Sequence, residues 1–205
     1  MRPGDAEKIF SDYLMLHRLP FLRAFRMDKG IVDFVIDAAE SRILCNVKEV
    51  RDSTPGGKPL GEAEVQIRNG IKELEAKVAN ARPRNPTVFV TMNFSSDFFT
   101  ALTVAKALFD EVAAPCVQDE NKAATSSAAP HLPGNNAASA ISHTHHLSGV
   151  LVFDYAQANH CLFPNPCAHH PVSESFFPGA RIIVLDRNPG PDTIKALSKI
   201  IFFRL

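Results

Sequence analysis

A chain of 205 residues is long enough to form one domain with a buried core. Hydrophobic residues make up 45% of it and the formal net charge is zero, so no overall electric field draws the chain to nucleic acid or to a membrane. Any site for a polyanion must then be a local patch. No apolar run is long enough to span a membrane and the N-terminus lacks the apolar stretch of a signal peptide, which predicts an intracellular, cytoplasmic protein.

The chain begins with a predicted helix and a strand. Residues 6–19 carry apolar side chains at helical spacing, and Asp5 is placed to cap the helix. Pro20 ends the helix, because proline disfavours helical geometry in the residue before it. Residues 21–27 alternate loosely between apolar and polar side chains, which indicates a strand.

Residues 31–50, IVDFVIDAAESRILCNVKEV, predict two strands joined by a turn at 38–41. Alternation places Leu44, Asn46, Lys48 and Val50 on one face of the second strand. A loop rich in Gly and Pro follows at 51–60. Residues 61–81 then predict a helix, because Ala63, Ile67, Ile71, Leu74 and Val78 form one apolar stripe.

The middle of the chain predicts a buried strand at residues 87–92 and a helix that begins at Ser96 or Asp97 and ends by Pro115. Residues 117–146 are rich in Ala, Ser and Asn and show no period. We expect them to be a disordered insertion, because such a composition buries little apolar surface.

The last part of the chain predicts two strands, at 149–155 and 181–186, and a helix at 192–203. The Pro- and His-rich segment 159–179 between the strands has no period, and we expect no regular structure in it. The fold class expected for residues 1–205 is therefore a single α/β domain, with a mixed central sheet flanked by helices.

Two charged side chains stand among apolar residues in the predicted hairpin. Asp33 lies in the first strand and Lys48 in the second, and burying such groups without a partner is costly. Together with Asn46 they offer what metal-assisted phosphodiester cleavage needs, which is oxygen ligands for the metal and a cation near the phosphate. The alternative interpretation is an ordinary ion pair on a half-solvated face of the sheet.

The order helix, three strands, helix, strand, with VDFVID followed by CNVKEV, resembles the PD-(D/E)xK nuclease superfamily over about residues 6–114. The resemblance implies a restriction endonuclease-like core, a Mg²⁺ ion (or Mn²⁺) and DNA as the substrate. It makes Asp33 the metal-binding aspartate and Lys48 the motif lysine. It also implies a metal-binding role for Glu7 on the first helix, and it sets Gln66 where some members carry a catalytic glutamine.

The chain departs from the family pattern at two positions. Val32 replaces the usual proline, and Asn46 stands where the motif has an acid. An amide oxygen can bind a hard cation, but without the charge of a carboxylate. Some restriction enzymes of the superfamily take the acid from the following helix instead, which makes Glu62 and Glu64 candidate metal ligands. Acids near a helix N-terminus are also explained by the helix dipole alone.

Two classes of function follow. The first is a metal-dependent nuclease that hydrolyses phosphodiester bonds in DNA. The second is a catalytically inactive relative that binds nucleic acid or protein, which the neutral Asn46 favours. The sequence leaves open whether the protein forms a homodimer.

A second group of possible ligands lies near the end of the chain. It consists of histidines and cysteines: His143, His145, His146, His160, Cys161, Cys167, His169 and His170. Imidazole and thiolate suit Zn²⁺. The spacing is not that of a common structural zinc site, so we interpret the segment as a His-rich surface loop.

Overall fold

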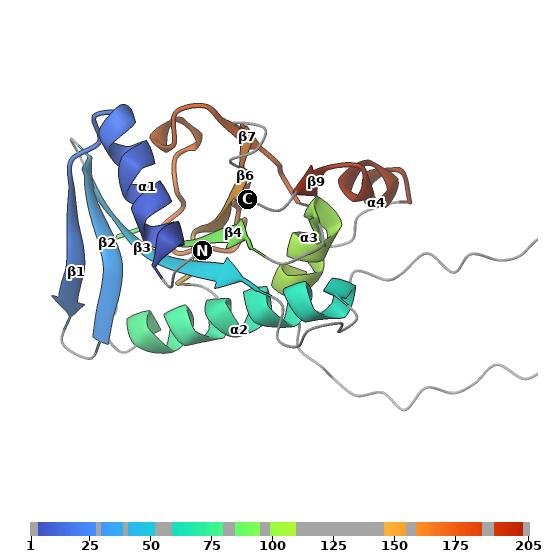
Figure 1. Ribbon diagram of the computed structural model, residues 1–205, viewed down its shortest axis with the longest axis horizontal. Helices are drawn as coiled ribbons and strands as arrows, with labels where there is room; N and C mark the ends of the chain where they lie inside the picture. Colours follow the sequence, from blue (N-terminus) through green and yellow to red (C-terminus); the bar gives the residue numbers. More distant parts are fainter. Residues whose placement is uncertain are drawn as a thin grey trace, which may run out of the picture.

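The computed structural model describes residues 4–27, 30–38, 41–51, 59–79, 85–94, 99–109, 146–154, 159–185 and 191–202. They form a mixed α/β fold around a seven-stranded sheet in the order β1-β2-β3-β4-β6-β7-β8 (Figure 1). The expected insertion at 117–146 lies outside the described residues except for its last one. The elements are α1 (Asp5–Leu16), β1 (Phe21–Met27), β2 (Gly30–Ala38), β3 (Ser41–Val50), α2 (Pro59–Ala79), β4 (Thr87–Asn93), β5 (Phe99–Thr100), α3 (Ala101–Phe109), β6 (Gly149–Asp154), β7 (Asn159–Pro164), the 3₁₀ helix η3 (Glu174–Phe176), β8 (Ala180–Ile182), α4 (Pro191–Ser198) and β9 (Ile201–Phe202).

The first three strands form an antiparallel meander, as the alternation predicts. The chain then crosses through α2, and β4 lies parallel to β3 with Asn46 beside Phe89 and Lys48 beside Thr91. Strand β6 is parallel to β4, and β7 returns antiparallel to β6. All seven residues of β4 are buried, because this strand lies near the middle of the sheet with covered faces on both sides.

Helices cover both faces of the sheet, and each face has its own hydrophobic core. Helix α1 buries Phe10 and Leu14 against side chains of β2, β3 and β4, such as Phe34 and Val47. Helices α2, α3 and α4 share the core on the opposite face, and Figure 1 shows α2 running along the sheet opposite α1. Strand β3 therefore lies between α1 on one face and α2 on the other.

Helix α1 does not begin as expected. Its N-cap is Gly4, whose φ of 93° is in the left-handed region, and Asp5 is the first helical residue. The prediction that Asp5 is the cap was therefore wrong by one position. Glycine reaches this φ without the steric penalty of a side chain. Asp5 and Glu7 then both fall in the first turn, where the helix dipole favours acidic side chains.

Two short strands were missed near the end of the chain. Segment 159–164, expected to be irregular, is β7 and pairs with β6. Residues 201–202, expected to be helical, form β9 and pair with Phe99 and Thr100 of β5. The helix expected from Ser96 or Asp97 also included these two residues of β5, but α3 begins only at Ala101. The predicted strand at 181–186 is shorter, since β8 contains three residues. None of the described helices combines the length and the apolar character that a membrane span requires.

Candidate functional site

The site begins where β2 parts from β3. Their ladder runs from Ala38 opposite Ser41 to Phe34 opposite Cys45, and Asp33 is the next residue of β2. The Asp33 carboxylate accepts a hydrogen bond from the backbone N–H of Val47 at 2.7 Å. Asp33 is half-buried. Burial is the largest cause of its raised pKa, to which the charge of Glu7 adds, while the Val47 N–H and the charges of Lys77 and Lys48 act in the opposite direction.

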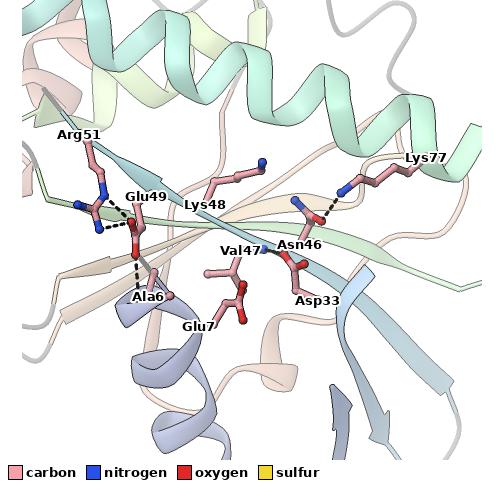
Figure 2. Close-up of a pocket in the computed structure, with 10 residues that line it drawn as sticks. Ala6, Glu7, Asp33, Asn46, Val47, Lys48, Glu49, Arg51 and Lys77 are labelled. Carbon is pink, nitrogen blue, oxygen red and sulfur yellow. Dashed lines mark hydrogen bonds and ion pairs between the residues drawn. The ribbon is translucent and has the colours of Figure 1, made fainter. Parts of the chain in front are cut away.

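Asn46 is fully buried on the face of β3 that points toward α2. Its Oδ1 accepts a hydrogen bond from Lys77 Nζ of α2 at 3.0 Å, and Figure 2 shows this bond. Because an ammonium group only donates, Lys77 determines which end of the amide is the oxygen. The Lys77 stem also passes Gly30 of β2, since a Cβ added to that glycine would lie 3.5 Å from Lys77 Cγ. The side chain of Lys77 thus reaches from α2 to both β2 and β3.

Lys48 points to the same face of β3 as Asn46, two residues further along the strand (Figure 2). Its Nζ forms an ion pair with Oε2 of Glu73 on α2 at 2.9 Å. This hydrogen bond is the main reason that the pKa of Glu73 is lowered. Glu73 and Lys77 are one helical turn apart, so a single face of α2 presents a carboxylate to Lys48 and an ammonium group to Asn46.

The opposite face of β3 carries a second pair of charges beside the start of α1. Glu49 Oε1 accepts a hydrogen bond from the backbone N–H of Ala6 at 3.1 Å, and its Oε2 binds the Arg51 guanidinium. The hydrogen bond to Glu49 is also the main cause of the raised pKa of Arg51. Glu7, on the same turn of α1, forms an ion pair with Arg23 of β1 at 3.3 Å.

The site contains one cavity of about 330 Å³. Its walls come from α1, β2, β3 and α2 and consist of Gly4, Ala6, Glu7, Asp33, Asn46, Val47, Lys48, Glu49, Arg51 and Lys77. The cavity combines three acidic and three basic side chains, so its net formal charge is zero, although the charges are separated between the two faces of β3. The carboxylates of Asp33 and Glu7 are the pair that could hold a cation. Glu49 is engaged by both Ala6 and Arg51, whereas the ion pair of Glu7 with Arg23 is exposed and easily exchanged.

The structure brings together four of the residues expected at the site: Glu7, Asp33, Asn46 and Lys48. Gln66 instead binds the backbone of Arg51, accepting from its N–H at 2.9 Å and donating to its carbonyl oxygen. Glu64 forms an ion pair with Arg68 at 2.7 Å. Neither Gln66 nor Glu64 lines the cavity. The side chain of Glu62 lies outside the described residues.

Sequence reasoning missed Lys77, Glu73 and Glu49. The spacing of Glu73 and Lys77 does indicate that they share a helical face. Nothing in the sequence shows that this face meets Asn46 and Lys48. The contact depends on how closely α2 approaches the sheet at Gly70, where an added Cβ would lie 2.5 Å from the ring of Phe89.

The His- and Cys-rich segment is spread over several elements. Cys161 is buried in β7, and Cys167 lies in the loop after β7. The rings of His146 and His169 are 5.7 Å apart, whereas His160 packs against Phe153 and Tyr13. Over the described ranges, no three His, Cys, Asp or Glu side chains are grouped to hold a metal ion. His143 and His145 lie outside those ranges.

The comparisons with known proteins found no match, since no family model, curated protein or solved structure is similar enough to this chain to indicate a family.

Proposed function

We propose that this chain is a metal-dependent nuclease that hydrolyses phosphodiester bonds in DNA. The observation that carries the proposal is that Asp33, Glu7 and Lys48, from three different elements, line one cavity at the point where β2 parts from β3. Two carboxylates and an ammonium group in a partly buried cavity are a combination suited to a cation and a phosphate.

The proposal is supported by the order of the elements around the cavity. Helix α1, the meander β1-β2-β3, the crossover helix α2 and the parallel strand β4 follow the order of a restriction endonuclease-like core. In such a core the metal-binding aspartate belongs to the second strand and the lysine to the third. Asp33 and Lys48 occupy these strands here.

The residues present fit a Mg²⁺ ion. Magnesium is usually held by one or two carboxylates together with substrate phosphates and water, and Asp33 and Glu7 provide two carboxylates. The mutual repulsion of these carboxylates, which raises the pKa of Asp33 beyond the effect of burial, would be relieved by a bound cation. Asn46 does not add to this set, because its oxygen already accepts a hydrogen bond from Lys77.

Each side chain would have one task in hydrolysis. A bound Mg²⁺ would supply charge stabilisation at the phosphate and a more acidic water. The backbone N–H of Val47 orients the Asp33 carboxylate and favours its ionised form, against the larger effect of burial. Lys48 would stabilise the negative charge that develops on the phosphate as water attacks phosphorus and the ester P–O bond breaks. The attacking water would release a proton to solvent, and the departing oxygen would take one up from solvent.

The experiment is cleavage of plasmid DNA with Mg²⁺ or Mn²⁺. We expect Asp33→Asn and Lys48→Met each to lower the rate by about 100-fold or more, since both side chains act on the reacting charge. Asp37→Asn is the matched control, because Asp37 lies on the same strand but pairs with Arg42 on the exposed surface. A rate unchanged by Asp33→Asn would contradict the proposal.

A second candidate is a catalytically inactive module of the same fold that binds nucleic acid or protein. One observation favours it: Asn46 and Lys48, the two motif residues of β3, are both engaged by α2. The two candidates differ in metal binding. The nuclease binds Mg²⁺ or Mn²⁺ through Asp33, whereas the module binds DNA or protein with no such metal.

A further inference from the structure

Asn46 carries a buried hydrogen-bond donor that the described part of the chain does not use. Its Nδ2 has no hydrogen-bond partner among the described residues, although the side chain is fully buried and lines the cavity. Buried polar groups are nearly always paired, because an unpaired one destabilises the folded protein. Since Lys77 binds Oδ1, the amide cannot turn over to present an oxygen instead.

Lys48, which lines the same cavity, has a partner that is easily exchanged. Asn46 and Lys48 project from the same face of β3, and Figure 2 shows Nδ2 of Asn46 turned away from Lys77 and toward the side of Lys48. The Lys48 and Glu73 side chains are 44% and 55% exposed. Exposed ion pairs contribute little to stability, so a stronger anion can replace the carboxylate.

We infer that Asn46 and Lys48 form the phosphate-binding position of the cavity, and that Glu73 holds this position until a DNA phosphate replaces it. The inference rests on the proposed function in taking DNA as the ligand. Nδ2 has almost no accessible surface in this structure. The side chains that cover it would therefore have to move as the phosphate enters, so that one phosphate oxygen accepts from Lys48 Nζ and another accepts from Asn46 Nδ2. Asn46 is then a donor to the substrate and not a metal ligand.

Substitutions of Asn46 and of Glu73 should change the affinity for DNA in opposite directions. We would measure the affinity for a short fluorescein-labelled DNA duplex by anisotropy, in EDTA, so that neither metal binding nor cleavage enters. Asn46→Asp keeps the size of the side chain and can still pair with Lys77, but it removes the donor and places a negative charge beside the phosphate, so we expect about tenfold weaker binding. Glu73→Gln removes the competing carboxylate, and we expect about threefold tighter binding.

Two controls test whether a change in net charge alone alters the affinity for DNA. Asn69→Asp adds the same charge at an exposed position of α2, and Asp37→Asn removes one from an exposed pair on β2. We expect each to change the affinity by less than twofold. In parallel, the side-chain NH₂ signals of Asn46, assigned with the Asn46→Asp variant, should shift on addition of inorganic phosphate, whereas those of Asn69 should not.

The inference is overturned if Asn46→Asp weakens DNA binding no more than Asn69→Asp, or if the Asn46 NH₂ signals do not respond to phosphate. Its failure is distinct from that of the proposed function. Asn46→Asp adds a carboxylate and should bind Mg²⁺ more tightly if Asp33 holds a metal. Suppose that the unsubstituted protein binds no metal, while Asn46→Asp weakens and Glu73→Gln strengthens DNA binding. That result would contradict the nuclease proposal and still support the phosphate-binding position.

Discussion

The carboxylate of Asp33 accepts a hydrogen bond from the backbone N–H of Val47, at 2.7 Å, in the place where the next bond between β2 and β3 would be expected. A side-chain carboxylate thus replaces a backbone carbonyl as the hydrogen-bond acceptor at the end of the ladder. This keeps an acidic group at the parting of the two strands, beside Asn46 and Lys48. The carboxylate is half-buried there, which gives it a raised pKa and a cost to stability.

That cost predicts a distinctive dependence of stability on pH. Because burial raises the Asp33 pKa, the folded protein binds this proton more tightly than the unfolded chain does. The free energy of unfolding should therefore fall as the pH rises from the ordinary aspartate range through the pKa that Asp33 has in the folded protein. Asp33→Asn keeps an acceptor for Val47 and should remove this fall. Urea denaturation of both proteins across this pH range measures it, and parallel curves would contradict the account.

The same shift predicts the acid limit of catalysis. Metal binding needs the ionised carboxylate, so Mg²⁺-dependent cleavage should be lost as the pH falls through the raised pKa of Asp33. Burial is the main cause of that shift and the charge of Glu7 adds to it. Glu7→Gln should therefore move the acid limb of the cleavage profile to lower pH while lowering the rate about tenfold or more. An acid limb that stays in place in Glu7→Gln would show that Glu7 does not act on Asp33.

Gln66 offers a prediction that separates a structural role from a catalytic one. Its amide binds both the N–H and the carbonyl oxygen of Arg51, at the end of β3. Gln66→Leu leaves both backbone groups without this partner and should lower the free energy of unfolding by about 2 kcal/mol. Chemical denaturation measures this change. We expect the cleavage rate at saturating Mg²⁺ to fall less than tenfold, whereas a loss as large as that of Lys48→Met would assign Gln66 to catalysis.

Gly70 should show the reverse of the usual effect of glycine in a helix. Alanine is normally favoured over glycine in helices by about 1 kcal/mol. At Gly70 a Cβ would lie 2.5 Å from the ring of Phe89, so α2 would have to move away from β4. We expect Gly70→Ala to lower the free energy of unfolding by about 1–3 kcal/mol. Thermal unfolding measures this, and a higher Tm in the variant would show that α2 does not pack as closely as described.

Local patterns were sufficient to predict most of the elements that form the site. The alternation in 43–50 predicted that Asn46 and Lys48 share a face, and the structure has this alternation, with Cys45 and Val47 in the core on the α1 side. The hairpin connection also predicted that Asp33 lies close to β3. These predictions depend on neighbours in sequence, for which the period of a strand is enough.

Contacts between distant segments could not be predicted in this way. The partners of Asn46 and Lys48 are set by the rotation of α2 over the sheet, which depends on the contact of Gly70 with Phe89. Ile201 and Phe202 fit a helical period, yet they form β9 because Phe99 and Thr100 offer a strand to pair with. Strand β7 was missed because its short apolar run stands in a Pro- and His-rich context.

The most direct test of the nuclease account is a calorimetric titration of the purified protein with Mn²⁺ and Mg²⁺, repeated with Asp33→Asn and with the control Asp37→Asn. The account predicts saturable binding that Asp33→Asn abolishes and Asp37→Asn retains. Absence of binding to the unsubstituted protein, or equal binding to all three proteins, would contradict it.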